Sequence, residues 1–119
     1  MRALPEPAAC DIDLASVFHA LGDPVRLELV RCLAEEGELT CAPAGLNVPK
    51  STLSNHWRIL REAGLTSTVV VGRTHRMRLR SADLEDRFPE LLATVLRATG
   101  NDAAHVTAGT GEDRGRSHS

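Results

Sequence analysis

The chain has 119 residues, with 42% apolar residues, 25% charged residues and a formal net charge of −2 at pH 7. We expect one compact domain, because this length leaves no room for a second sizeable one, and it excludes a multidomain enzyme. Aromatic residues are scarce, with two Phe, one Trp and no Tyr, so we expect a core of Leu, Val and Ala built mainly from helices.

The N-terminal third predicts an arm and two helices. Residues 1–10 carry two prolines and no helical period, so we expect a flexible arm. Residues 11–21 place apolar side chains at helical spacing and are followed by a glycine, which predicts a first helix. Asp23 is a favoured N-cap and Pro24 a favoured first helical residue, which predicts a second helix that ends before Gly37.

A third helix is predicted between Pro49 and Gly64, after a segment in which we expect at most one helical turn, at 41–44. On a helical wheel its residues divide into two arcs. The arc expected to face the core holds Leu53, His56, Trp57, Ile59, Leu60 and Ala63. The polar arc holds Lys50, Ser51, Ser54, Asn55, Arg58, Arg61 and Glu62.

A hairpin follows. Residues 65–71 and 74–80 are β-branched-rich or alternating stretches, joined by Gly72-Arg73, which suits a type II′ turn. We therefore predict a two-stranded ribbon whose second strand presents arginines on one face.

The C-terminal part predicts one more helix and a tail. An apolar stripe runs from Leu84 to Leu96, and Pro89 must either begin the main helix or kink it, with a start near Pro89 favoured. Residues 100–119 are too polar to bury much apolar surface, so we expect a disordered tail. The folded domain is expected to span 11–99.

Charge is distributed unevenly along the chain. Residues 50–80 contain seven basic residues and one acidic residue, a net charge of +6, whereas the rest of the chain has a net charge of −8. Such a segment concentrates positive potential on one surface and orients the molecule on a polyanion.

The order of the elements is that of a winged helix-turn-helix, a mainly α fold with a two-stranded β-wing, in which the polar third helix enters the major groove of double-stranded DNA beside the hairpin. Short polar side chains let the helix approach the duplex, Asn pairs with adenine, and Arg contacts guanine, phosphate or a narrow minor groove. The candidate DNA-binding residues are Lys50, Ser51, Thr52, Ser54, Asn55, Arg58, Arg73, Arg76 and Arg78. Arg80 is a further candidate, and any of the hairpin arginines has the alternative of pairing with the acidic body.

The sequence also bears on two other functions. No glycine-rich phosphate loop, paired carboxylates or Cys-His-Asp arrangement stands out, so we do not expect an enzyme. The alternative is a winged-helix protein–protein interaction module that places its basic hairpin on an acidic partner.

The sequence resembles the ArsR/SmtB type of bacterial winged-helix repressors. The resemblance covers roughly 19–96 and rests on the stretches 20–27 (ALGDPVRL) and 51–65 (STLSNHWRILREAGL) and on the Gly72-Arg73 turn. It implies a homodimer, formed through the first and last helices, that represses transcription from an inverted-repeat operator. The inducing signal cannot be identified from the sequence.

Many members of this family release DNA on binding a transition metal. Cys10 and Cys41 match two ligand positions of one family site, but Leu39 occupies the place of a third thiol. The other family site needs His and carboxylates on the last helix, and 84–99 contains no His. Cys10 and Cys41 are therefore the only candidate metal ligands that the resemblance offers, and a thiol-reactive trigger at Cys41 is an alternative.

Compartment is inferred from composition. No apolar run approaches the roughly 18 residues of a membrane span, and no signal-peptide pattern precedes the domain. Three cysteines, an odd number, fit reduced thiols better than a disulfide framework, so we expect a cytoplasmic protein without a membrane partner.

Overall fold

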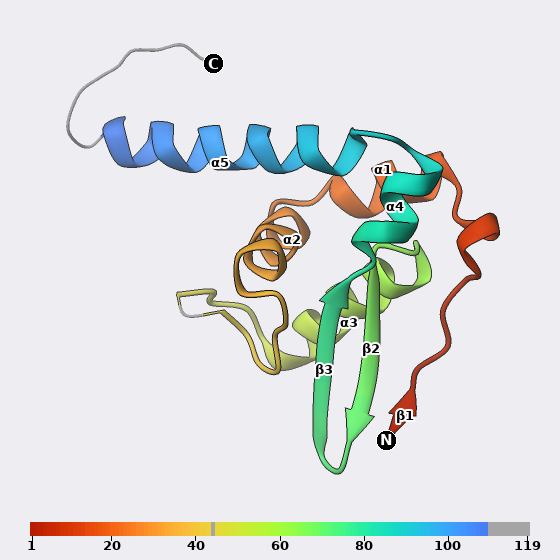
Figure 1. Cartoon of the computed structure of the whole chain (residues 1–119). Coiled ribbons are helices and arrows are strands. Elements are labelled where there is room, and N and C mark those ends of the chain that lie inside the picture. Colours follow the sequence, from red (N-terminus) through yellow and green to blue (C-terminus); the bar gives the residue numbers. More distant parts are fainter. Residues whose placement is uncertain (44, 110–119) are drawn as a thin grey trace.

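The computed structural model describes residues 1–43 and 45–109, with side chains described as far as Gly100. Figure 1 shows a helical body from which a long hairpin projects at one end, while the last helix crosses the opposite end. The elements in chain order are β1 (Arg2–Ala3), η1 (Ala9–Asp11), α1 (Leu14–Leu21), α2 (Pro24–Glu36), α3 (Lys50–Glu62), β2 (Thr66–Val71), β3 (Thr74–Leu79), α4 (Ser81–Arg87) and α5 (Leu91–Gly109).

Local capping explains where the first helices begin. The Asp13 side chain accepts a hydrogen bond from the Ser16 amide, so α1 begins at Leu14, three residues later than predicted, and Ala9–Asp11 forms a separate 3₁₀ turn. The Asp23 side chain accepts from the amides of Val25 and Arg26, which confirms the predicted start of α2. These caps satisfy amides that a helix leaves without intrahelical partners.

The end of α3 also depends on backbone conformation. Gly64 follows the helix with φ of +89°, and the side chain of Ile12 lies directly against it. Only glycine adopts this conformation readily, so it ends α3 and lets the segment before α1 pack closely. The predicted helical turn at 41–44 is absent at 41–43, and residue 44 lies outside the described residues. Leu39 instead pairs with Met77, which ties this segment to β3.

The hairpin is part of a three-stranded sheet in the order β1-β2-β3. Strands β2 and β3, called the wing below, pair antiparallel from Thr66↔Leu79 to Val71↔Thr74, and Gly72 at the turn has φ of +61°. The prediction of a two-stranded ribbon was incomplete, because Arg2 pairs with Val70 in the segment that we expected to be an arm. The free edge of β2 offers unpaired backbone groups to any strand that reaches it.

Side chains fasten the N-terminal segment to the body. Arg80 donates to the Pro7 carbonyl at 2.7 Å and lies 3.6 Å from the Glu6 carboxylate, and Arg61 donates to the Pro5 carbonyl at 3.2 Å. The side chain of Arg80 is only 7% exposed. Of the two roles open to it, pairing with the acidic body is the one observed.

The C-terminal part contains two helices where one was predicted. Helix α4 ends at Arg87, Glu90 adopts a φ of +66°, and α5 begins at Leu91, close to the start favoured near Pro89. Helix α5 is described as far as Gly109, ten residues into the segment for which we expected disorder, and the disorder of the tail stays a prediction. Each residue added to an existing helix gains one backbone hydrogen bond. The polarity of a segment does not show whether a preceding helix will extend into it. The predicted disorder of 110–119 lies outside the described residues.

One hydrophobic core joins the helices to the sheet. Ile12, Val17, Leu29, Leu60 and Leu65 are each buried to within 1% of complete burial. The predicted stripe of the C-terminal part packs on the same core, with Leu84 and Leu92 buried and its other members partly buried. No helix in the described part of the chain is both long and apolar enough to span a membrane.

Candidate nucleic-acid interface

Helix α3 presents a continuous polar face to solvent. Its buried residues are His56, Trp57 and Leu60, as the helical wheel predicted. The opposite face is exposed except at Arg61, which is partly buried. The six predicted DNA-binding residues of α3 are all exposed: Lys50, Ser51, Ser54, Asn55 and Arg58 on that face, and Thr52 in the first turn.

A buried polar contact fixes how α3 sits on α2. The Arg26 guanidinium donates to the carbonyls of Ala20 and His19, and its Nη1 lies 3.0 Å from His56 Nδ1. Because a guanidinium only donates, Nδ1 of His56 is the acceptor. The sequence placed His56 on the arc expected to face the core, but it did not single out Arg26. A signal was present, because Arg26 precedes Leu29, Val30 and Leu33 at the spacing of the apolar stripe of α2.

The wing carries its three candidate arginines in two places. Arg73 is exposed at the turn, whereas Arg76 and Arg78 are exposed on β3 on either side of the buried Met77. Side chains alternate along a strand, so Arg76 and Arg78 lie on the face of the wing opposite to Met77. Arg76 Nε is 3.7 Å from a carboxylate oxygen of Glu38. The structure therefore separates Arg76 and Arg78 from the side that faces α3.

A groove between α3 and the wing brings four of the candidates together. Lys50, Ser54 and Arg58 from the helix and Arg73 from the turn all line it. Two elements that are adjacent in the chain thus form opposite walls of one basic concavity. Asn55 lies next to this set on the exposed face of α3.

The side chain of Arg58 is held in a network that binding to DNA must rearrange. It donates to Glu62 Oε1 at 2.9 Å and to Asn55 Oδ1 at 2.5 Å. Both Arg58 and Glu62 are about half exposed, and an ion pair of this kind contributes little to stability. Arg58 and Asn55 can therefore exchange these contacts for bases or phosphates at small cost.

Arg2 is a basic residue at this surface that the sequence analysis missed. Arg2 pairs with Val70 of β2, and Val70 lies only two residues before Gly72 at the turn. The side chain of Arg2 is exposed. Paired residues on neighbouring strands point to the same face, and Leu4, farther along the same segment, lines the groove, so Arg2 lies on the groove side of the wing. No local signal could have found it, because its position depends on a pairing across 68 positions of sequence.

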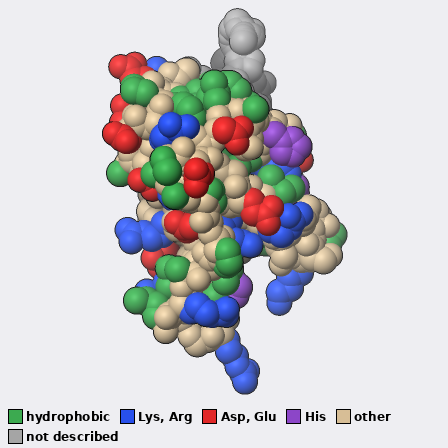
Figure 2. Space-filling view, turned by 90° about the vertical axis from the view of Figure 1, so that its right-hand side faces the viewer, with side chains coloured by type: hydrophobic (Ala, Val, Ile, Leu, Met, Phe, Trp, Pro, Cys, Tyr) green, Lys and Arg blue, Asp and Glu red, His purple; other side chains and the backbone are tan. Residues whose placement is uncertain are grey.

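Basic and acidic side chains gather at different ends of the molecule. In Figure 2 the lower end, which holds the tip of the wing, shows Lys and Arg side chains and no Asp or Glu, whereas acidic side chains lie over the upper part. The uneven charge of the sequence thus becomes a basic end on a protein of net negative charge, which favours approach of a polyanion in one orientation.

The cysteines lie away from this basic surface or at its edge. Cys10 and Cys41 are exposed, and the described residues contain no group of three or more His, Cys, Asp or Glu able to hold a metal ion. These two thiols alone do not make the three- or four-ligand set of a closed site.

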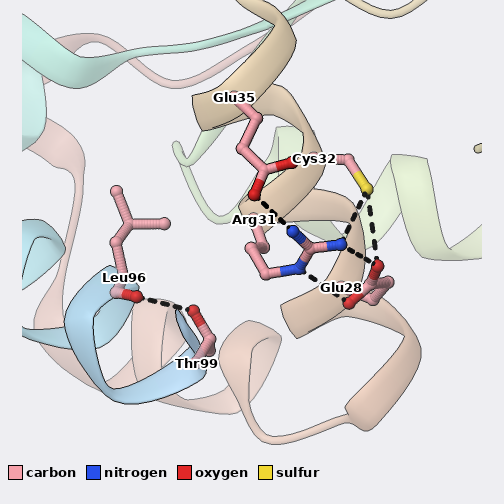
Figure 3. A network of polar contacts seen from close by, with 6 residues as sticks. All are labelled: Glu28, Arg31, Cys32, Glu35, Leu96 and Thr99. Carbon is pink, nitrogen blue, oxygen red and sulfur yellow. Dashed lines mark hydrogen bonds and ion pairs between the residues drawn. The ribbon is translucent and has the colours of Figure 1, made fainter. Parts of the chain in front are cut away.

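Cys32 belongs to a polar cluster on α2. Figure 3 shows its thiol beside Glu28 and Arg31, and Arg31 also pairs with Glu35. Burial and the neighbouring Glu28 carboxylate raise the pKa of the Cys32 thiol, which keeps it protonated and unreactive near neutral pH. Cys32 is only 8% exposed, so its side chain packs within the fold.

Comparison with known proteins identifies a helix-turn-helix regulator. Residues 21–69 match the family described as a helix-turn-helix domain. The HTH-type transcriptional regulator YceK of Bacillus subtilis is 40% identical over 84 residues, which cover 68% of this chain and 84% of YceK. The HTH-type transcriptional regulator MJ1325 of Methanocaldococcus jannaschii is 31% identical over 83 residues, which cover 68% of this chain and 89% of that protein.

Solved structures agree with these sequence relatives. An ArsR-like transcriptional regulator from Rhodococcus sp. RHA1 superposes with a TM-score of 0.53 at 29% identity, covering 82% of this chain and 88% of the other. The crystal structure of an ArsR family transcriptional regulator superposes with a TM-score of 0.54 over 84% of this chain and 93% of the other, and at 18% identity it supports the fold alone. The chain thus has the winged helix-turn-helix fold and belongs to the DNA-binding helix-turn-helix transcriptional regulators of the ArsR type.

Proposed function

We propose that this regulator is a cytoplasmic homodimeric repressor, released from an inverted-repeat operator by an effector. The observation that carries the DNA-binding geometry is the exposed polar face of α3 beside a basic wing. Short side chains at Ser51, Thr52 and Ser54 let the start of α3 approach base edges, and Asn55 and Arg58 follow one turn later.

The wing adds contacts to the sugar–phosphate backbone in this proposal. Arg73 at the turn enters or borders the minor groove of the DNA. Arg76 and Arg78 face the phosphates on one side of this minor groove, and Arg2 faces those on the other side. This assignment uses both faces of the wing, because a ribbon placed in a groove has phosphates on each side. Lys50 completes the set as a phosphate contact at the start of α3.

Two exposed apolar side chains support the dimer. Leu14 is 43% exposed and Phe18 is 54% exposed, and they are one turn apart on α1. Figure 1 shows α5 crossing the end of the body opposite the wing and extending beyond α2, where a second copy can pack against it. We infer a symmetric interface formed by α1 and α5, which would place two α3 helices on the two half-sites of a palindrome.

The dimer has its own test. Replacing Phe18 by Glu puts a charge into the proposed interface, so sedimentation equilibrium should show monomers at concentrations where the natural protein is dimeric. Circular dichroism checks that the exposed substitution leaves the helices folded. A natural protein that stays monomeric at micromolar concentrations contradicts the interface.

DNA binding is tested with a gel shift on the region upstream of the protein's own gene. Neutralising about 6 to 10 phosphates should give a steep fall of log K with log salt, with a slope of about −0.9 per phosphate. Repeating the shift with transition metals, chelator and oxidant tests Cys10 and Cys41 as effector residues. A shallow slope on every palindromic duplex contradicts the proposed interface, since charge contacts to DNA release counterions.

A further inference from the structure

The groove between α3 and the wing has the size and the apolar lining of a small-molecule site. Its volume is about 880 Å³, within the range of clefts that hold small organic molecules. Its lining includes the apolar side chains of Leu4, Leu53, Trp57 and Met77. Trp57 and Met77 are 8% and 4% exposed, so they form the floor and not the rim.

Charge around this floor has one sign. Lys50, Arg58, Arg61 and Arg73 line the groove, and its described lining contains no Asp or Glu. Arg61 uses its Nε on the Pro5 carbonyl at 3.2 Å, which leaves the other guanidinium nitrogens without a partner among the described residues. An apolar floor beside several cations is complementary to a ligand that has an apolar body and an anionic end.

A second observation lies within the same lining. Thr68 is 2% exposed, and its Oγ1 has no hydrogen-bond partner among the described residues. Buried hydroxyls are normally paired, so an unpartnered one at a cleft is a position at which a ligand supplies the missing partner. Thr66, two residues earlier on β2, has the same unpartnered hydroxyl but does not line the groove.

We propose that the groove binds a small amphiphilic carboxylate. Its apolar part lies over Trp57, Leu4 and Met77, its carboxylate pairs with Arg58 and Arg61, and it offers an acceptor to Thr68. Resting on the proposed function, this ligand is an effector that competes with DNA, because Arg58 serves both and Lys50 and Ser54 line the groove that the ligand fills. No conformational change has to pass through the protein for this competition.

The binding test does not need DNA. Trp57 is the only Trp in the chain, so its fluorescence reports the groove directly. We expect octanoate to change the fluorescence saturably, with half-saturation about tenfold lower than for 1-octanol or acetate, because each comparison ligand lacks one of the two recognised parts. Equal binding of octanoate and 1-octanol, or no saturation by octanoate, overturns the proposal.

A matched pair of variants tests the hydroxyl. Thr68→Val and Thr66→Val each remove one buried, unpartnered hydroxyl from β2 with little change of shape. Thr68→Val should weaken octanoate binding about threefold to tenfold, whereas Thr66→Val should leave it unchanged. Equal affinity in the two variants overturns the assignment of Thr68 to the site. Arg61→Gln should weaken octanoate but not 1-octanol.

The competition is measured separately. Octanoate should raise the apparent dissociation constant for the upstream duplex, with ionic strength held constant by sodium chloride because DNA binding is itself salt-dependent. Saturable quenching of Trp57 without any effect on DNA affinity overturns the effector role and leaves the DNA-binding proposal intact. Absence of DNA binding with normal quenching of Trp57 overturns the proposed operator function and leaves the carboxylate site intact.

Discussion

Arg26 Nη1 and His56 Nδ1 lie 3.0 Å apart in the core, and this contact joins α2 to the helix that carries the candidate DNA-binding residues. The two residues are only 8% and 9% exposed. A charged group this deeply buried needs its partners, so the contact restrains α3 more specifically than apolar packing alone.

Replacing His56 by Ala should therefore destabilise the protein. One donor of the Arg26 guanidinium loses its acceptor, and a buried hydrogen bond to a charged group contributes about 1.5–3 kcal/mol to the free energy of unfolding. Urea denaturation followed by circular dichroism measures this loss. His19→Ala is the matched control, because that side chain is exposed and only its carbonyl contacts Arg26. Similar losses in both variants would contradict the bracing role of His56.

The exposed pair Asn55 and Arg58 should determine sequence preference. The double variant Asn55→Ala/Arg58→Ala should bind specific and scrambled duplexes almost equally, since each base contact contributes about 1–3 kcal/mol of discrimination. Competition gel shifts measure the ratio. The control is Glu28→Ala/Arg31→Ala, which removes a hydrogen-bonded pair of the same i,i+3 spacing from α2. Unchanged discrimination in the first variant removes α3 from the proposed site.

Arg2 should contribute one phosphate contact. Arg2→Ala is expected to make the slope of log K against log salt less steep by about 0.9, while the urea midpoint stays the same because the side chain is exposed. Arg31→Ala removes one charge from α2 and should leave the salt slope unchanged. An unaltered slope for Arg2→Ala would show that the N-terminal strand lies away from the duplex.

Two glycines with similar backbone angles should differ in their tolerance of Ala. Gly64 has φ of +89°, and an added Cβ would lie 2.5 Å from Ile12 Cγ1, whereas Gly37 has φ of +83° with nothing within 4 Å. Gly37→Ala should cost about 1–2 kcal/mol from backbone strain alone. Gly64→Ala should cost about 1–3 kcal/mol more, because Ile12 must move in a packed core. Thermal or urea unfolding of both variants measures the difference, and equal losses would contradict the close packing.

Acid should weaken the fold partly through the cap of α2. Partial burial raises the pKa of Asp23, but hydrogen bonds from the amides of Arg26 and Val25 and the Arg26 charge outweigh it, so its pKa lies below the ordinary value. A carboxylate with a depressed pKa in the folded state stabilises the protein above its unfolded pKa of about 4, and this stabilisation is lost as pH falls through the folded value.

Asp23→Asn should accordingly reduce the loss of unfolding free energy between neutral pH and pH values below about 4. Asparagine still caps the helix, so stability at pH 7 should fall less than in Asp23→Ala, which is expected to cost about 0.5–2 kcal/mol. Urea denaturation across this pH range measures both effects. An acid dependence identical to that of the natural protein would contradict the cap's part in it.

Sequence patterns predicted the elements whose causes are local. The cap of α2, the two arcs of α3 and the turn at Gly72 each depend on residues within a few positions of one another, and the structure confirms them. The division of α3 into buried and exposed residues even identified the face that carries the candidate site. Helical spacing alone determines which side chains share a face.

Tertiary structure decided whatever depends on contacts between distant segments. The pairing of Arg2 with Val70 turned an expected arm into a third strand and added a basic residue to the site. Three further features also depend on contacts between distant segments. They are the contact of Arg26 with His56, the ion pair of Arg80 with Glu6 and the groove that Thr68 lines. These features depend on which strand edge, carboxylate or ring nitrogen comes within hydrogen-bonding distance after the chain folds. The local periodicity of the sequence does not encode these distances.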